Sequence, residues 1–137
     1  MIVFDTDVMS YVLRRDPPAG LLRRIAEIDP EDQATTSITL GELVYGAHRS
    51  KRPEHFMSRL KEMLLPNLKV LAFDRKAAEV YGEVRAKLEK VGRPVAEPDL
   101  RIASICLCQE ASLATGNIRH YQKVPELKVE DWLKSCR

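Results

Sequence analysis

The chain has 137 residues, of which 45% are hydrophobic and 31% charged, and its formal net charge at pH 7 is +2. This length and composition suit one domain with its own core, so residues 1–137 are interpreted as a single domain, and a disordered chain is excluded. The near balance of 22 basic and 20 acidic residues excludes recognition of a polyanion through overall charge alone.

The sequence has no pattern typical of export or membrane insertion. The apolar segment at residues 2–4 directly follows Met1, and no apolar run approaches the roughly 20 residues that cross a bilayer. Cys106, Cys108 and Cys136 lack the spacing of a zinc site and suit a reducing compartment as free thiols. We therefore expect a cytoplasmic protein.

Short apolar runs alternate with helical periodicity along the chain. The runs predict strands at residues 2–4, 33–37, 68–73 and 113–115. Apolar spacing predicts helices at residues 8–15, 21–28 and 53–65, and three more that begin near Thr39, Asp74 and Pro98. A final helix ends this order, with residues 129–133 closing the chain. Alternating strands and helices favour a three-layer α/β/α fold with a central parallel sheet.

Four polar residues fall at the predicted strand ends or at the helix starts beside them. Asp5 follows the first strand, and Glu42 completes a capping-box pattern with Thr39. Asp99 lies in the first turn of an apolar helix that we expect to be buried, and Asn117 follows the strand at 113–115. Because the carboxyl ends of parallel strands share one edge of a sheet, we expect these four residues to converge.

Converging carboxylates repel one another, and a hard divalent cation with oxygen ligands relieves that repulsion. The pattern therefore predicts a site for Mg²⁺, or alternatively Mn²⁺. Taken singly, Glu42 and Asp99 are also explained as acids that favour the start of a helix. The sequence shows neither a nucleophile–histidine pattern nor a glycine-rich phosphate loop, which leaves hydrolysis by a metal-activated water as the expected chemistry.

Residues beside these acids have two interpretations each. The hydroxyls of Thr6 and Thr115 either orient a carboxylate or bond to nearby backbone. Asp7 is either an additional outer-sphere acid or the cap of the helix that follows it. Arg101 and Arg119 either hold a phosphate or form an ion pair with a local acid. The sequence leaves these alternatives open.

The polar positions lie within longer recognisable segments, which are IVFDTDVMS at 2–10, TSITLGELVYG at 36–46, YGEVRA at 81–86, GRP at 92–94, DLRIAS at 99–104, LATGNIRHY at 113–121 and VEDW at 129–132. Together these segments resemble the PIN-domain nucleases, in particular the VapC-type toxins of bacterial toxin–antitoxin modules. The resemblance covers nearly the whole chain in the same order.

The resemblance implies a PIN fold and a Mg²⁺-dependent endoribonuclease that hydrolyses RNA, forms a homodimer or a toxin–antitoxin hetero-oligomer, and is inhibited by a cognate antitoxin. It implies that Asp5 and Asp99 are the principal metal ligands. Glu42 would complete the metal site or position the attacking water, and Asn117 would be the fourth catalytic position. Asn117 is a departure, because many PIN nucleases have an acid there, so we expect a second metal to bind more weakly.

Two further departures reduce the negative charge at the fourth position, namely Gly116 and His120, the latter standing where an acid is common. The resemblance also implies that an antitoxin helix docks on the early helices, whose apolar residues are otherwise plain core. These residues are Leu13, Leu21, Leu22 and Ile25.

Three other functions compete with the toxin hypothesis. The segment Asp5-Thr6-Asp7 also resembles the haloacid-dehalogenase phosphatases, although the sequence lacks their closing acidic pair with a preceding lysine. A PIN-like RNA-processing nuclease without an antitoxin is the second alternative. The third is a non-catalytic RNA-binding module, against which the joint presence of Asp5, Glu42 and Asp99 argues.

Overall fold

A parallel β-sheet forms the centre of the computed structural model, which describes residues 1–64 and 66–136. Within these residues its five strands are β1 (Ile2–Phe4), β2 (Gln33–Thr36), β3 (Lys69–Leu71), β4 (Ser112–Thr115) and β5 (Val129–Asp131). Their order across the sheet is β3-β2-β1-β4-β5, and every neighbouring pair is parallel. The predicted parallel α/β fold is therefore confirmed. The expectation that the order ends on a helix, with residues 129–133 closing the chain, is wrong, because residues 129–131 form β5, a short edge strand that is only half-buried and has Glu130 at its centre.

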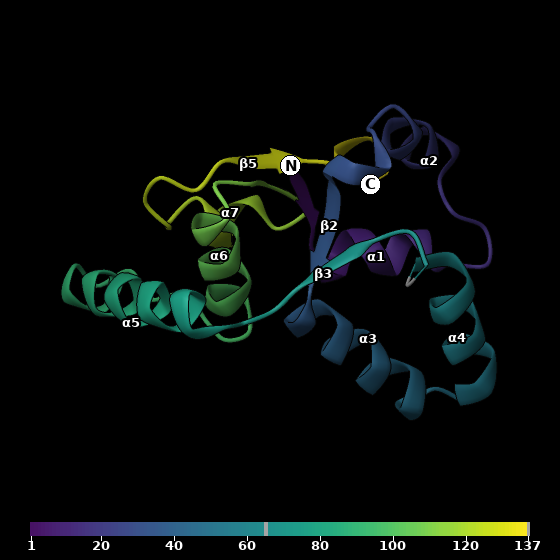
Figure 1. Ribbon diagram of the computed structural model, residues 1–137, viewed down its shortest axis with the longest axis horizontal. Coiled ribbons are helices and arrows are strands. Elements are labelled where there is room, and N and C mark those ends of the chain that lie inside the picture. Colours follow the sequence, from purple (N-terminus) through teal and green to yellow (C-terminus); the bar gives the residue numbers. More distant parts are fainter. Residues whose placement is uncertain (65, 137) are drawn as a thin grey trace.

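Helices cover both faces of the sheet (Figure 1). On one side lie α1 (Thr6–Val12), α2 (Ala19–Ala26), α3 (Ser37–Arg49) and α4 (Pro53–Arg59), and on the other lie α5 (Arg75–Lys90), α6 (Asp99–Cys108) and α7 (Ile118–Tyr121). Successive residues of a strand point to opposite faces. Ile2 and Phe4 accordingly join the core under the first group, and Val3 joins the core under the second. The three-layer architecture is confirmed.

The sheet changes direction at β1. The chain passes from β1 to β2 and β3 on one side, and later returns to β4 and β5 on the other. Ile2 is in register with both Gln33 and Ser112, so β1, β2 and β4 run side by side and end at the same edge. Ligands of open parallel sheets bind outside the carboxyl ends of the strands at such a switch point. This topology brings the residues that follow β1, β2 and β4 to one place.

Helix α1 begins two residues before its predicted start at residue 8. The carboxylate of Asp5 accepts a hydrogen bond from the backbone N–H of Val8 at 2.9 Å, which caps the helix directly at the end of β1. The prediction that Asp7 is the cap is therefore wrong. Asp7 lies in the first turn of α1 and its side chain is exposed.

Helix α3 also starts earlier than the capping-box pattern predicts. It begins at Ser37, and its cap is Thr36, whose hydroxyl accepts a hydrogen bond from the backbone N–H of Thr39 at 3.0 Å. The predicted capping box of Thr39 and Glu42 is wrong, because Thr36 is both the last residue of β2 and the cap. As a result Glu42 lies in the second turn of α3 rather than in the first.

The remaining helices follow their predictions more closely. Asp74 caps α5 by accepting a hydrogen bond from the N–H of Ala77 at 3.0 Å, and six of the ten residues of α6 are buried. The predicted helix at 53–65 is present up to residue 64, since α4 spans Pro53–Arg59 and continues directly into a π-helical turn at Leu60–Leu64. Residue 65 lies outside the described residues. The short helix α7 and two 3₁₀ turns, at 30–32 and 134–136, are not predicted by the sequence pattern.

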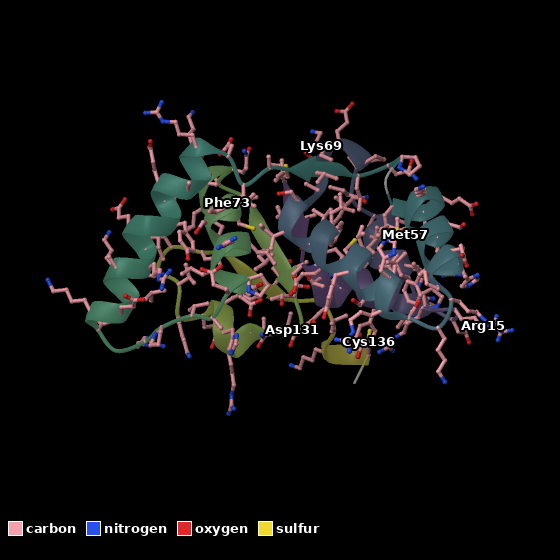
Figure 2. The ribbon with its side chains drawn as sticks, turned by 90° about the horizontal axis from the view of Figure 1, so that it is seen from below. Arg15, Met57, Lys69, Phe73, Asp131 and Cys136 are labelled. Carbon is pink, nitrogen blue, oxygen red and sulfur yellow. The ribbon has the colours of Figure 1, made fainter. Side chains whose placement is uncertain are left out.

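The outside of the molecule carries many charged side chains, and Figure 2 shows that of Arg15 extending away from the loop after α1. In the part of the chain that the structure describes, no helix has both the length and the apolar character needed to cross a membrane.

Candidate active site

Asp5 is the most buried acid of the predicted site, with only 3% of its surface exposed. It follows β1 directly, and its Oδ1 accepts the capping hydrogen bond from Val8. Its Oδ2 accepts a hydrogen bond from the hydroxyl of Thr115, the last residue of the neighbouring strand β4. The hydroxyl of Thr115 in turn accepts a hydrogen bond from the backbone N–H of Asn117 at 2.9 Å. The interpretation of Thr115 as a hydroxyl that orients a carboxylate is the one its contacts support.

The surroundings of Asp5 disfavour its charged form. Burial raises the pKa of the Asp5 carboxyl to about 7, and repulsion from Asp7 and Asp99 adds to the increase. The hydrogen bonds from Thr115 and Val8 lower this pKa without cancelling the effect of burial. No Lys, Arg or His among residues 1–64 and 66–136 forms an ion pair with Asp5. At the switch point the chain thus buries a carboxylate that none of the described cations compensates.

Glu42 is joined to the end of β1 through Thr6. The Thr6 hydroxyl lies 2.5 Å from Oε1 of Glu42, to which it donates, and 3.3 Å from the hydroxyl of Thr39. Thr39 is completely buried and also contacts the hydroxyl of Thr36 at 3.2 Å. This row of hydroxyls fixes the Glu42 carboxylate beside the residue that follows Asp5. Orientation of a carboxylate is therefore the supported interpretation of Thr6.

Asp99 is the first residue of α6 and is held by two side chains from α7. Its Oδ2 lies 2.9 Å from Nδ1 of His120, and its Oδ1 accepts a hydrogen bond from the hydroxyl of Tyr121 at 3.2 Å. Tyr121 is 1% exposed, and burial together with the negative charges of Asp99 and Asp5 strongly raises the pKa of its phenol. Sequence reasoning missed both contacts, since α7 itself was not predicted.

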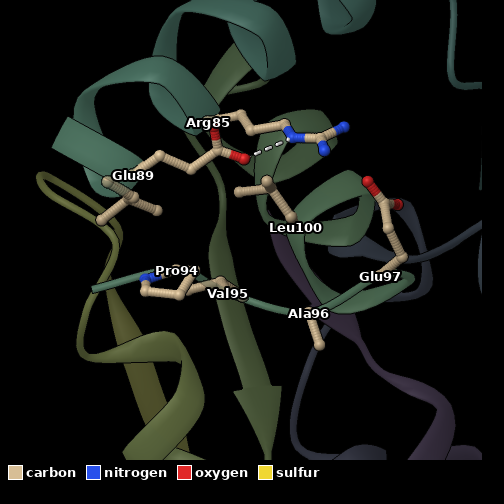
Figure 3. A pocket seen from close by; sticks show the side chains of 8 residues that line it. Arg85, Glu89, Pro94, Val95, Ala96, Glu97 and Leu100 are labelled. Carbon is tan, nitrogen blue, oxygen red and sulfur yellow. Dashed lines mark hydrogen bonds and ion pairs between the residues drawn. The ribbon is translucent and has the colours of Figure 1, made fainter. Parts of the chain in front are cut away.

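The backbone before Asp99 is packed between α5 and α6 (Figure 3). The buried side chains of Val95 and Leu100 flank this stretch, and Arg85 pairs with Glu89 at 3.0 Å on the adjoining face of α5. These residues line a cavity of about 230 Å³. The packing of Val95 and Leu100 fixes the start of α6, and with it the position of Asp99.

The structure brings the predicted acids to one edge of the sheet, though not into a preassembled metal cage. Asp99 is close enough to raise the pKa of Asp5, and Glu42 is linked to the same edge through Thr6. Among the described residues, however, no group of three or more His, Cys, Asp or Glu side chains is disposed to hold an ion. Mg²⁺ in proteins commonly uses one or two carboxylates and retains several waters. The all-oxygen donors and the uncompensated charge of Asp5 fit such a cation.

A family model, described as PIN domain, matches residues 2–127. The chain belongs to the PIN-domain family. A relative, ribonuclease VapC2 of Rickettsia felis, is 33% identical over 132 residues, which cover 96% of this chain and 98% of the relative. The tRNA(fMet)-specific endonuclease VapC of Salmonella typhimurium is 31% identical over 130 residues, 95% of this chain and 96% of that one.

Solved structures support the same membership. A chain in the crystal structure of VapBC2 from Rickettsia felis bound to a promoter DNA fragment superposes with a TM-score of 0.85 at 32% identity, over 96% of this chain and 99% of that chain. A chain of DNA-bound VapBC from Salmonella typhimurium gives a TM-score of 0.86 at 30% identity, over 96% and 97% of the two chains. The recognition of a VapC-like PIN domain from the sequence motifs is confirmed.

The two arginines near the site of this PIN domain differ in their contacts. Arg101 forms an ion pair with Glu97 at 2.7 Å, and its guanidinium lies 5.7 Å from the ring centroids of both Phe73 and Tyr81. The ion-pair interpretation therefore holds for Arg101. Arg119 is exposed on α7 and forms no ion pair with any described acid. It is the better candidate for a phosphate contact.

Proposed function

We propose that this PIN domain is a Mg²⁺-dependent endoribonuclease and the toxin of a toxin–antitoxin module. The observation that carries the proposal is the buried Asp5 carboxylate, which Asp99 repels and which the described cations of the chain leave uncompensated. Relatives named ribonuclease VapC2 and tRNA(fMet)-specific endonuclease VapC support the reaction class. RNA is accordingly the proposed substrate.

Asp5 and Asp99 would hold the metal, and Glu42 would complete the site or position the attacking water. When bound, Mg²⁺ (or Mn²⁺) supplies positive charge that stabilises a phosphodiester under attack and lowers the pKa of a bound water. Asp5 suits this role, because a carboxyl whose pKa is near 7 without a cation gains the most from acquiring one.

The residues of the chain orient the reactants. Thr115 and the N–H of Val8 fix the two oxygens of Asp5, and Thr6 fixes Oε1 of Glu42, whose other oxygen is left to accept a proton from the attacking water. The oxygen of that water would form a bond to phosphorus while the bond to the leaving ribose oxygen breaks, and the leaving oxygen would take up a proton from solvent water. Arg119 would hold a phosphate oxygen of the substrate.

Cleavage of total cellular RNA by the wild type and by Asp5→Asn, each with Mg²⁺ and with EDTA, tests the proposal. We expect cleavage by the wild type with Mg²⁺ only, and a loss of at least about 100-fold in Asp5→Asn, because several kcal/mol of charge stabilisation disappear. Asp16→Asn, which changes an exposed acid in the loop after α1, is the matched control. Equal cleavage by wild type and Asp5→Asn would refute the assignment.

An apolar groove supports the proposed antitoxin partner. It has a volume of about 310 Å³ and is bordered by Leu22 and Ile25 of α2 and by Met63, and the side chains of Leu22 and Met63 are 39% and 40% exposed. Leu13 and Leu21 are 2% exposed, so their predicted part in docking is wrong, and they are core residues. An amphipathic antitoxin helix would fill the groove.

The relatives solved as VapBC complexes motivate this partner, together with a homodimer or hetero-oligomer acting in the cytoplasm. Leu22→Asp should abolish inhibition by the antitoxin encoded in the adjacent reading frame while RNA cleavage continues. Retained inhibition would argue against this groove. The absence of any such neighbouring gene would favour the RNA-processing alternative.

A further inference from the structure

Helix α7 contacts both halves of the candidate site. At its start, the N–H of Asn117 donates to the hydroxyl of Thr115, which itself donates to Oδ2 of Asp5. At its end, His120 and Tyr121 contact the two oxygens of Asp99. A continuous path of short contacts therefore runs from one carboxylate, through four residues of helix, to the other.

The two contacts to Asp99 restrict it in a way that one contact would not. A carboxylate only accepts hydrogen bonds, so the contact at 2.9 Å requires the proton of His120 to be on Nδ1. The Tyr121 hydroxyl donates to the other oxygen, and the two donors together fix the rotation of the carboxylate plane. Each oxygen keeps a lone pair beyond the one that these donors use.

The ring of Tyr121 anchors this arrangement in the core. Tyr121 is 1% exposed and belongs to the same apolar cluster as Ile102, Leu113 and Val124. His120, in contrast, has 43% of its side chain exposed and can be exchanged without opening the core. We call the two residues that hold Asp99 the clamp. Tyr121 is its rigidly packed member, and His120 is its member that is accessible to substitution.

We propose that His120 and Tyr121 are positioning residues that orient Asp99 toward a divalent cation, and that α7 sets the spacing between Asp99 and Asp5. This inference rests on the proposed function, since it concerns the metal of that reaction. Partners that orient a ligating carboxylate commonly change metal affinity by about 10- to 100-fold when they are removed.

Calorimetric titration of Mn²⁺ into the full-length protein tests the proposal without relying on activity. Tyr121→Phe keeps the buried ring and removes only the hydroxyl, and we expect it to weaken Mn²⁺ binding by about tenfold. We expect a similar loss from His120→Ala and recovery in His120→Asn, because the Asn amide N–H donates from nearly the position of Nδ1. Tyr45→Phe and His55→Ala, both on exposed side chains, are the matched controls and should bind as the wild type does.

The alternative is that these contacts only stabilise α7. In that case Tyr121→Phe and His120→Ala would lower the melting temperature and leave Mn²⁺ affinity within about twofold of the wild type, which would overturn the proposal. Failure of His120→Asn to recover affinity would also overturn it. Asp5→Asn separates this inference from the proposed function. If only Asp5→Asn loses Mn²⁺ affinity, the positioning role of His120 and Tyr121 is refuted and the proposed metal site stands. If Asp5→Asn binds Mn²⁺ as the wild type does, both proposals are refuted.

Discussion

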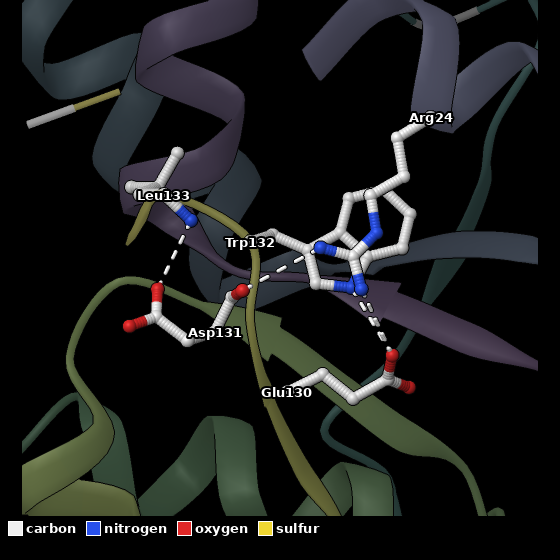
Figure 4. Close-up of polar contacts among 5 residues, drawn as sticks. All are labelled: Arg24, Glu130, Asp131, Trp132 and Leu133. Atoms are coloured by element: carbon white, nitrogen blue, oxygen red, sulfur yellow. Dashed lines mark hydrogen bonds and ion pairs between the residues drawn. The ribbon is translucent and has the colours of Figure 1, made fainter. Parts of the chain in front are cut away.

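Two groups of acids on the same sheet have opposite electrostatic surroundings. In β5, Glu130 at the centre of the strand pairs with Arg24 at 3.4 Å, and the Arg24 guanidinium also lies 4.2 Å from the centroid of the Trp132 ring (Figure 4). The carboxylate of Asp131 accepts a hydrogen bond from the backbone N–H of Leu133 at 3.1 Å. We call Glu130 and Asp131 the β5 group. At the end of β1, Asp5 has hydrogen-bond donors and nearby acids, and no described cation pairs with it.

The difference separates the acids of a structural ion pair from the acids of the proposed site. Glu130 is half-exposed and compensated by Arg24, which costs little desolvation, and the bond from Arg24 to the backbone carbonyl of Asp131 also ties α2 to the last strand. Asp5 is buried and paired with no described cation, which disfavours its charged form, and such acids are typical of sites where a ligand supplies the missing charge. Both groups contain acids that lie in or directly after a strand, so location does not distinguish them. The difference is whether a described cation pairs with the acids of the group.

The largest expected effect concerns the pH dependence of the free energy of unfolding, measured without divalent cations. The unfolded chain releases the Asp5 proton near pH 3.8, and the folded chain retains it until about pH 7. Since the folded state binds more protons between these values, the Asp5 contribution to the free energy of unfolding falls as pH rises through this window, by on the order of 4 kcal/mol. Denaturant unfolding of the wild type and Asp5→Asn at pH 4 to 8 measures the difference. Parallel curves would contradict it, and Mg²⁺ at pH 8 should restore stability to the wild type only.

A second test places another acid near Asp5, at position 117. Asn117→Asp should strengthen binding of a second Mn²⁺ by about tenfold, because affinity for hard cations rises with the number of charged ligands. The same change should lower the melting temperature of the metal-free protein. Calorimetric stoichiometry measures the first effect, with Asn67→Asp, which precedes β3 and lies away from the carboxyl ends of the strands, as a control. Unchanged stoichiometry and affinity would show that position 117 does not face the metal.

A third test asks whether Arg119, a cation near the site, binds a phosphate of the substrate instead of pairing with an acid of the chain. Arg119→Ala should lower kcat/KM on a short RNA by about tenfold, which corresponds to about 1.4 kcal/mol for one phosphate contact. Its melting temperature should not change, since no described acid pairs with this side chain. Arg23→Ala, an exposed arginine of α2, is the control. Unaltered kinetics in Arg119→Ala would remove this role.

The smallest expected effect concerns the compensated group. Arg24→Met should lower the free energy of unfolding by about 1 kcal/mol, because it removes a half-exposed ion pair and a cation–π contact. RNA cleavage should stay within about twofold. Arg75→Met breaks an ion pair whose side chains are 92% and 65% exposed, and it should have almost no effect on unfolding. A loss of cleavage in Arg24→Met would show that the two groups are not independent.

Much of the site could be predicted from the sequence, because strand ends and apolar runs are local patterns. The segments around Asp5 and Asp99 indicated both acids, and the alternation of strands and helices indicated that they share one edge. The start of α3 was predicted wrongly, because Thr36 and Thr39 are equally good caps and only the end of β2 decides between them. His120 and Tyr121 could not be assigned to Asp99, since α7 has four residues and no periodic signal.

By itself, the sequence determined the α/β class and the motifs of the PIN family, because each depends on which residue types follow one another. Only the tertiary structure decided which acids are compensated. Arg24 reaches Glu130 across more than a hundred residues, and Thr115 reaches Asp5 across a similar span. The charge state of a carboxyl depends on its burial and on its neighbours in space, and neither is encoded in the residues beside it in the chain.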